Sequence, residues 1–423
     1  MAGNDVLTGS APAILKPYTI NHQLRPGSAL IVSAKEYVFP QSKLEQPCDV
    51  IREPVTPDDL VWDDEVDPDN PRNWPQWQRI YCTAIPALQL LIITMALSSY
   101  VPATPGIQEH FGTTYQVTTL GVSLYLLGLG IGPLPIAPLS EMFGRRPFYC
   151  YGIPLLLLFT IGSASAKNIG VLLVCRILGA LLGSGALSVI GGTVLDIWDI
   201  KKGGESTTHV SLHSSSISLV ELGALAACIA TLTPLTGPVI GPVAATYIIS
   251  DRHNDWRYGL WVNVFVGTPI FILTFLLRET YGPQILMKRA KRRGIALQDT
   301  RPRKEAAMHI LHIAFTRPVH MLLTEPLVLL PAFYGGFTYL LLISFLGSYP
   351  YVFEAIFHFQ PKAVSLAFLG ILVGLLLGII GYIACAITVK KRALAGDPTA
   401  EVPEAQLRPA LIGSVLLPTS LFW

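Results

Sequence analysis

The sequence predicts an all-α integral membrane protein, and three observations support that prediction. Of the 423 residues, 51% are hydrophobic and only 14% are charged, whereas a soluble domain carries roughly a quarter charged residues. The apolar residues lie in runs of about twenty, the length of helix that crosses the hydrocarbon core of a bilayer. Lysine and arginine collect in alternate connections between these runs. Much of the protein surface is therefore expected to face lipid.

A polar tail, residues 1–79, precedes the first apolar run. Seven acids lie within residues 58–69, and a segment of this composition buries too little apolar surface to fold alone. The tail does not open with a basic region followed by an apolar core, so we expect no cleaved signal peptide. Trp74 and Trp77 stand at its end, where tryptophan suits the headgroup layer of a membrane. We predict a disordered cytoplasmic tail that ends in an interfacial anchor.

Eight apolar runs follow the tail, and a ninth begins near Leu407 and ends with the last residue. We therefore expect eight complete spans and part of a ninth. The eight predicted spans are residues 82–102, 116–138, 148–166, 169–195, 219–249, 258–277, 326–348 and 363–389. The fifth contains three prolines, and we predict one tilted, kinked helix there, because two short helices would reverse the direction of every later span.

The basic residues of the connections set the orientation of the spans. The connections after spans 2, 4, 6 and 8 are rich in lysine and arginine, whereas those after spans 1, 3 and 7 hold almost none, and the connection after span 5 is mixed. Ten of the thirty lysines and arginines lie between Arg278 and Arg317. We therefore place the N-terminus and the even-numbered connections in the cytoplasm.

The long basic connection after span 6 divides the predicted chain into two bundles. Its stretch Lys304–Phe315 has a helical pattern. The predicted domains are a cytoplasmic tail (1–79), a six-span N-terminal bundle (80–277), a basic cytoplasmic linker (278–325) and a partial C-terminal bundle (326–423).

A short motif, PLSEMFGRRP, joins spans 2 and 3 and holds Glu141, Gly144, Arg145 and Arg146 within one turn. Glycine suits the end of a helix, and cations there complement the helix dipole. Capping and topology alone would account for these residues. However, Glu141 is also placed to pair with an arginine or a neighbouring helix end, in a contact that breaks when the bundles rock. We interpret the motif as a conformational hinge.

Two further patterns lie inside the predicted spans. Arg176 is the only cation in the middle of an apolar run, and a charge inside a membrane usually faces a cavity or a partner. We therefore predict a functional role for it rather than an idle structural one. In span 5, Gly237 and Gly241 are four residues apart, and each precedes a proline. Small residues at that spacing allow a neighbouring helix to pack closely. The spacing alone favours neither of two interpretations, a kinked packing helix and a helix with a gating role.

In this order, the motifs resemble the fungal drug:proton antiporters, which are twelve-span members of the major facilitator superfamily. The resemblance covers residues 70–423 and rests on NPRNWP, PLSEMFGRRP, the arginine of span 4, GPVIGP, DWRYGLWVNV and RETYGPQILMKRAKRRG. It implies a helical bundle of the major facilitator type, with six N-terminal spans and an incomplete C-terminal bundle. By resemblance, the matching positions are a conformational-switch motif at Glu141, Gly144, Arg145 and Arg146, a proton-coupling arginine at Arg176, and an antiporter motif at Gly237, Gly241 and Pro242.

The sequence departs from the family pattern at several positions. Ala245 and Thr246 replace the paired glycines of span 5, and Ala180 replaces the glycine four residues after the span 4 arginine. Residues 201–218 are rich in serine and threonine, unlike the short charged loop expected there, and we interpret them as a mis-spliced or misread stretch. The second half stops three spans short of the family pattern, so a truncated, nonfunctional transporter is one open interpretation.

The resemblance implies export of small organic molecules, drugs or secondary metabolites, driven by inward proton flow with alternating access. Candidate residues of the substrate cavity are Tyr125, Asn263, Tyr339 and Tyr349. An uptake carrier of the same fold remains an alternative. A seven-span receptor is disfavoured by eight spans with a cytoplasmic N-terminus. No carboxylate lies deep in a predicted span, so we identify no proton-accepting residue.

No other chemistry stands out in the sequence. The six cysteines and nine histidines show no metal-ligand spacing, and we find no nucleophile elbow or phosphate-binding glycine loop. We therefore expect no catalytic residues, no metal, no cofactor and no nucleic-acid partner. The expected partners are a small-molecule substrate, protons and the lipid bilayer. We expect a monomer in the plasma membrane.

Overall fold

The computed structural model describes residues 60, 62–64, 67–198, 219–295, 316–394 and 408–422, all within the unit Arg52–Trp423. These residues form helices and no strand, which confirms the predicted all-α fold class. Seven helical segments of the described residues, some of them made of two consecutive helices, are long and apolar enough to cross a membrane. The predicted helical stretch Lys304–Phe315, the serine- and threonine-rich stretch 201–218 and most of the tail lie outside the described residues.

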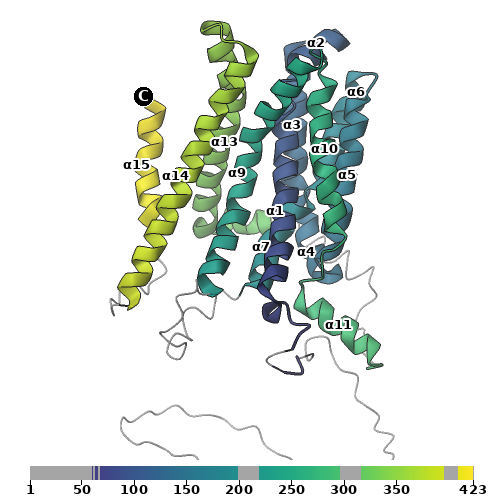
Figure 1. Ribbon diagram of the computed structural model, residues 1–423, viewed down its shortest axis with the longest axis vertical. Helices are drawn as coiled ribbons and strands as arrows, with labels where there is room; N and C mark the ends of the chain where they lie inside the picture. The colour runs from purple at the N-terminus through teal and green to yellow at the C-terminus, as the bar shows by residue number, and fades with distance from the viewer. Residues whose placement is uncertain are drawn as a thin grey trace, which may run out of the picture. The chain divides into compact units, whose positions relative to one another are not determined.

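The first half of the chain forms a packed bundle in which α1 occupies the centre (Figure 1). Its helices are α1 (Gln76–Ser98), α2 (Thr104–Phe111), α3 (Tyr115–Ile131), α4 (Pro133–Phe143), α5 (Arg146–Ala164), α6 (Ile169–Gly183), α7 (Gly185–Ile197), α9 (Leu219–Asp251) and α10 (Arg257–Thr274). Before α1 lies the 3-10 helix η3 (Pro71–Asn73). The sixth predicted span, α10, is not among the seven membrane-length helices, but it packs against α1, α5 and α9.

Two predicted spans are built from two consecutive helices. The second span consists of α3 and α4, which meet at Gly132 and Pro133, and the fourth consists of α6 and α7, which meet at Ser184. The two junctions touch: a Cβ on Gly132 would lie 2.1 Å from the Ser184 Oγ. Pro133 is tolerated in the first turn of α4, because a backbone N–H at that position would have no acceptor within the helix. The fifth span is the single long helix α9, as predicted, and it contains its three prolines.

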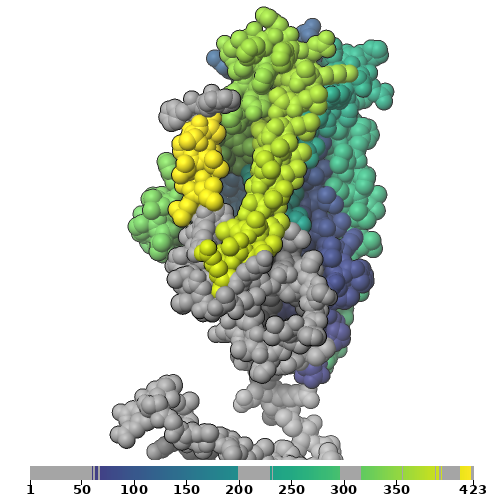
Figure 2. All heavy atoms as spheres, turned by 60° about the vertical axis from the view of Figure 1, so that its left-hand side comes forward, coloured from purple at the N-terminus to yellow at the C-terminus, as the bar shows by residue number. Residues whose placement is uncertain are grey.

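Burial separates the two halves of the chain. In the most apolar 18-residue stretch of α1, 72% is buried. The corresponding share is zero in the span formed by α13 and η4 and 17% in α14, although all three spans are strongly apolar. The second-half helices are α13 (Pro326–Pro350), the π-helix η4 (Tyr351–Ile356), α14 (Pro361–Leu394) and α15 (Arg408–Phe422). Of these, α14 packs against α9 and α13. Figure 2 shows α15 next to α14.

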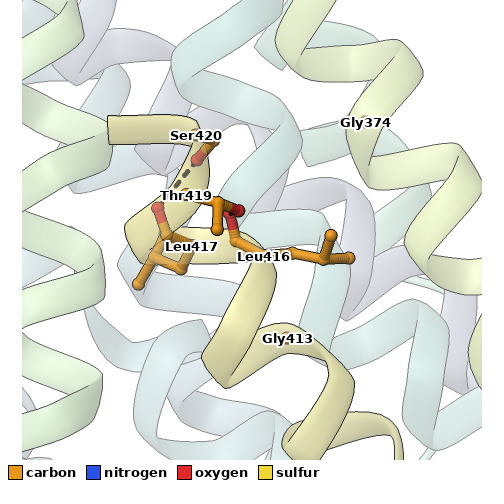
Figure 3. A pocket seen from close by; sticks show the side chains of 6 residues that line it. All are labelled: Gly374, Gly413, Leu416, Leu417, Thr419 and Ser420. Carbon is orange, nitrogen blue, oxygen red and sulfur yellow. Dashed lines mark hydrogen bonds between the residues drawn. The ribbon is translucent and has the colours of Figure 1, made fainter. Parts of the chain in front are cut away.

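An open groove lies between α14 and α15 (Figure 3). Its lining residues are small, apolar or hydroxylated: Gly374, Gly413, Leu416, Leu417, Thr419 and Ser420. The Ser420 hydroxyl donates to the Leu417 carbonyl at 2.8 Å within the same helix. The groove contains none of the residues singled out from the sequence and no charged group.

Candidate functional site

The hinge between α4 and α5 is organised around a buried arginine. Gly144 ends α4 with a φ of +92°, a conformation that favours glycine. Arg145 follows with 8% of its surface exposed. Its Nε donates a hydrogen bond of 2.5 Å to the carboxylate of Asp196 near the end of α7, and its Nη1 donates to the Val189 carbonyl at 3.5 Å. A charge-assisted pair therefore joins the start of α5 to α7.

A second carboxylate, Glu279, caps the first turn of α5. It follows α10 in the chain and accepts hydrogen bonds from the backbone N–H groups of Arg145 at 2.8 Å and Arg146 at 3.4 Å. A carboxylate at a helix N-terminus satisfies donors that have no helical partner and complements the dipole. A Cβ on Gly144 would lie 2.3 Å from the Glu279 Oε2. This close approach is a second reason for glycine at the hinge.

Further contacts tie the hinge to the end of α10. The Arg146 guanidinium donates to the Phe275 carbonyl at 3.1 Å. The Arg145 guanidinium lies over the Tyr281 ring, 5.4 Å from its centroid. The hinge is therefore a network that holds α5, α7 and the end of α10 together at one end of the bundle.

Glu141, which the sequence analysis placed in the hinge, has a different environment. Its side chain is exposed at the end of α4, and within the described part of the chain it forms no ion pair. The acids that face the hinge arginines are instead Asp196 and Glu279. Sequence reasoning did not select these two as site residues, although Glu279 lies in the quoted segment RETYGPQILMKRAKRRG.

The second buried arginine, Arg176, lies on α6 in the interior of the bundle and is 4% exposed. Its guanidinium donates to the carbonyls of Ala96 at 2.7 Å and Leu97 at 3.4 Å, both in the last turn of α1, and to that of Gly121 in α3 at 3.2 Å. Carbonyls in the last turn of a helix lack helical donors and carry the negative end of the dipole. Arg176 therefore caps α1 and joins it to α3.

Two tyrosine rings complete the environment of Arg176. The guanidinium carbon lies 4.5 Å from the Tyr100 ring centroid and 4.3 Å from that of Tyr125. The hydroxyls are held by backbone carbonyls, Tyr100 by Thr118 at 3.0 Å and Tyr125 by Ile93 at 2.8 Å. No carboxylate forms an ion pair with Arg176 among the residues described. Helix carbonyls and aromatic faces compensate its charge instead.

The glycines of α9 pack against the same part of α1. A Cβ on Gly237 would lie 1.9 Å from the Thr94 Oγ1, and one on Gly241 would lie 2.0 Å from the Ser98 Oγ. The Ser98 hydroxyl donates to the Gly237 carbonyl at 3.2 Å. Pro242 follows and is buried. The small residues therefore allow the backbones of α9 and α1 to approach more closely than alanine would permit.

The four candidate cavity residues lie on three helices, α3, α10 and α13. Tyr125 belongs to the Arg176 environment, whereas Asn263 on α10 is fully buried and donates to the Ser99 hydroxyl at 2.7 Å. Tyr339 is half-buried on α13. Tyr349 packs among aromatic rings, 5.0 Å between centroids from Phe368. The end of α1 thus gathers the first two, and Tyr339, on the second half, lies close enough to Tyr125 to interact with it electrostatically.

The comparisons with known proteins agree on one family. A model of the family described as Major Facilitator Superfamily matches residues 87–423. The chain is 32% identical over 403 residues to Polyamine transporter 4 of Saccharomyces cerevisiae, covering 88% of this chain and 57% of that protein. It is 31% identical over 373 residues to the MFS-type transporter traF of Penicillium crustosum, covering 88% and 72%, and 32% identical over 368 residues to the efflux pump FUB11 of Gibberella moniliformis, covering 84% and 58%. The chain therefore spans 57–72% of the length of these relatives.

Proposed function

Because the chain belongs to the major facilitator superfamily, we propose that it is a multi-pass membrane transporter that exports small organic molecules by proton antiport. This membership confirms the predicted family resemblance. Export is supported by relatives named as efflux pumps, such as FUB11. The expected substrates are drugs or secondary metabolites. One relative is named a polyamine transporter, so a polyamine belongs among the compounds to be tested.

The structural observation that carries the proposal is the hinge network of Arg145, Asp196 and Glu279. Arg145 is nearly enclosed, and both acids reach it from elements other than its own. Such a network has a strong preference for one arrangement, because separating the partners leaves a charge without compensation. In the proposed mechanism, the network forms when the cytoplasmic ends of the helices are packed together, and it is lost when these ends separate. It thereby biases which side of the membrane the substrate path faces.

Arg176 has a proposed role in proton coupling that is indirect. A guanidinium stays protonated in proteins, so Arg176 does not itself carry the transported proton. Its positive charge lies in the interior of the bundle beside Tyr100 and Tyr125, where it favours a negative charge on any group that comes close. The proposed antiporter thus uses Arg176 to tune a group that approaches during the cycle.

We place the transporter in the plasma membrane as a monomer, with its N-terminus and basic connections in the cytoplasm. The hinge and the described part of the basic connection lie at one end of the bundle (Figure 1). An uptake carrier of the same fold and an inactive fragment are the alternatives that the experiment must separate.

Transport into inside-out and right-side-out membrane vesicles tests the proposal. We expect a compound from a broad panel, including a polyamine, to accumulate in inside-out vesicles with an acidic lumen, and a protonophore to abolish the accumulation. Asp196→Asn should reduce it strongly. Asp255→Asn is the matched control, because Asp255 pairs with an arginine in the partly exposed connection between α9 and α10. Accumulation only in right-side-out vesicles would indicate an uptake carrier, and none in either would indicate an inactive chain.

A further inference from the structure

The acidic segment before α1 binds one face of the basic helix α11 (Gly282–Arg292), which follows the hinge residue Glu279. Arg289 forms a two-pronged ion pair with Asp67, with the Nη1 on Oδ2 and the Nη2 3.4 Å from Oδ1. Arg293, directly after α11, forms a second one with Asp63 at 3.0 and 2.5 Å. Asp69 adds a contact of 3.6 Å to Arg289. The acidic segment before α1 therefore neutralises both Arg289 and Arg293, which lie four residues apart.

Asp67 is held in place by its own loop. Only 2% of its side chain is exposed. Its Oδ1 accepts a hydrogen bond from the backbone N–H of Asp69 at 3.0 Å, and its carbonyl accepts one from the Asn73 side chain at 3.0 Å. Asn73 belongs to η3, and the next residue is the buried Trp74 at the entrance to α1. The carboxylate is thus fixed relative to the start of α1.

The other end of α11 leads directly into the hinge network. Only Thr280 and Tyr281 separate Glu279 from α11; Thr280 is buried, and the Tyr281 ring lies under the Arg145 guanidinium. The helix also packs against α4, which enters the hinge from the other side. Glu279 lies only three residues before the first residue of α11. A movement of α11 therefore displaces the Glu279 carboxylate.

The neutralisation is confined to one face of α11. Lys288, Lys291 and Arg292 are exposed and form no ion pair in the residues that the structure describes. The hydrogen bond from Arg289 lowers the pKa of the Asp67 carboxyl, so the pair stays ionised at neutral pH. The helix therefore offers a matched comparison between paired and unpaired cations.

We propose that Asp67 is a positioning residue that acts through Arg289: it holds α11 so that Glu279 remains on the N–H groups of Arg145 and Arg146. Loss of the ion pair between Asp67 and Arg289 weakens the hold of Glu279 on the first turn of α5. The helices at the hinge end of the bundle then separate more easily. The consequence for transport rests on the proposed function, whereas the positioning of Glu279 does not.

Amide hydrogen exchange of residues 144–150 in the full purified chain tests the positioning. Arg289→Gln and Asp67→Asn should each speed exchange at Arg145 and Arg146 about tenfold, an effect between those of an exposed and a buried ion pair, because Arg289 is partly exposed and Asp67 is buried. The double variant should exchange no faster than the faster single variant, because both remove the same contact. Arg292→Gln removes a cation of the same helix that forms no ion pair with the described part of the chain, and it should leave exchange unchanged. Equal effects of Arg289→Gln and Arg292→Gln, or additive effects of Asp67→Asn and Arg289→Gln, would overturn the proposal.

A transport measurement on the same variants separates the two proposals. With active transport, Arg289→Gln and Asp67→Asn should change the maximal rate in the same direction, Arg289→Gln at least as strongly because Arg289 also contacts Asp69, and Arg292→Gln should not change it. A change in Asp67→Asn with none in Arg289→Gln would contradict the coupling of Asp67 through Arg289. If no variant, including the unaltered chain, moves any compound, the proposed function fails while the exchange result still decides the positioning.

Discussion

The two buried arginines of the first half solve the same electrostatic problem in different ways. At the end of the bundle, the Arg145 side chain pairs with the Asp196 carboxylate, and the Arg145 backbone N–H donates to the Glu279 carboxylate. In the interior, Arg176 has three helix carbonyls and two aromatic rings and no acid among the described residues. A pair of ions can separate and re-form as helices move, whereas a cap on a helix end is part of the helix packing. In the proposed mechanism, the ion pair of Arg145 with Asp196 is therefore the contact that breaks and re-forms, whereas Arg176 holds α1 and α3 together.

The sharpest way to break this comparison is to remove Arg176. Arg176→Ala leaves three buried carbonyls without their donor and removes the link between α1 and α3. We expect a loss of about 3–9 kcal/mol in stability, since each buried acceptor left without a partner costs about 1–3 kcal/mol. Transport should be abolished. Thermal unfolding in detergent and vesicle transport measure the two effects. Arg176→Lys keeps the charge but not the fork of donors, and it should recover only part of the stability. Full stability in Arg176→Ala would refute the capping role.

Removing one acid of the hinge is expected to have the next largest effect. Asp196→Asn leaves the buried Arg145 guanidinium with a neutral partner, and removing one partner of a buried pair costs about 3–5 kcal/mol. Because 22% of the Asp196 side chain is exposed, we expect a smaller loss of about 2 kcal/mol. Thermal unfolding measures the loss. The double variant Arg145→Gln/Asp196→Asn should be more stable than Asp196→Asn alone. If it is less stable, the two residues do not act as a pair.

These two sites also show what sequence can and cannot predict. The apolar runs predicted the membrane-length helices because hydropathy is read from consecutive residues, although the sixth predicted span, α10, is not among those helices. The isolated Arg176 drew attention because its neighbours in the sequence are apolar. The partners were not predictable in this way. Asp196 and Glu279 are 51 and 134 residues from Arg145, so only the packing of α5, α7 and α10 brings them together. The partners of Arg176 are backbone carbonyls, which leave no signature in residue types. Glu141 drew attention because it is close in sequence, yet it is exposed and forms no ion pair with the residues that the structure describes.

The close contact of α9 with α1 gives a smaller and more local prediction. Gly241→Ala places a methyl group where the Ser98 hydroxyl and the Met95 carbonyl lie, 2.0 and 2.8 Å from the ideal Cβ position. Overpacking of this kind costs about 1–3 kcal/mol, and thermal unfolding should show it. The control is Gly130→Ala on α3, where the Cβ meets no atom within 4 Å, and where we expect a small gain in helix stability. Equal effects of the two substitutions would show that α9 adjusts without cost.

The smallest expected effect concerns pH, and it separates the pair outside the bundle from the arginines inside it. The Arg289 hydrogen bond lowers the pKa of the Asp67 carboxyl below its ordinary value of 3.8. A carboxyl with a lowered pKa in the folded protein contributes stability that is fully present above 3.8 and is lost as the pH falls through the lowered value. The difference in stability between the unaltered chain and Asp67→Asn should therefore be constant from about pH 5 to pH 8 and shrink only in stronger acid. Thermal unfolding of both proteins across this range measures it. A difference that changes between pH 5 and pH 8 would mean that Asp67 titrates there, and the pair with Arg289 would then be too weak to position α11.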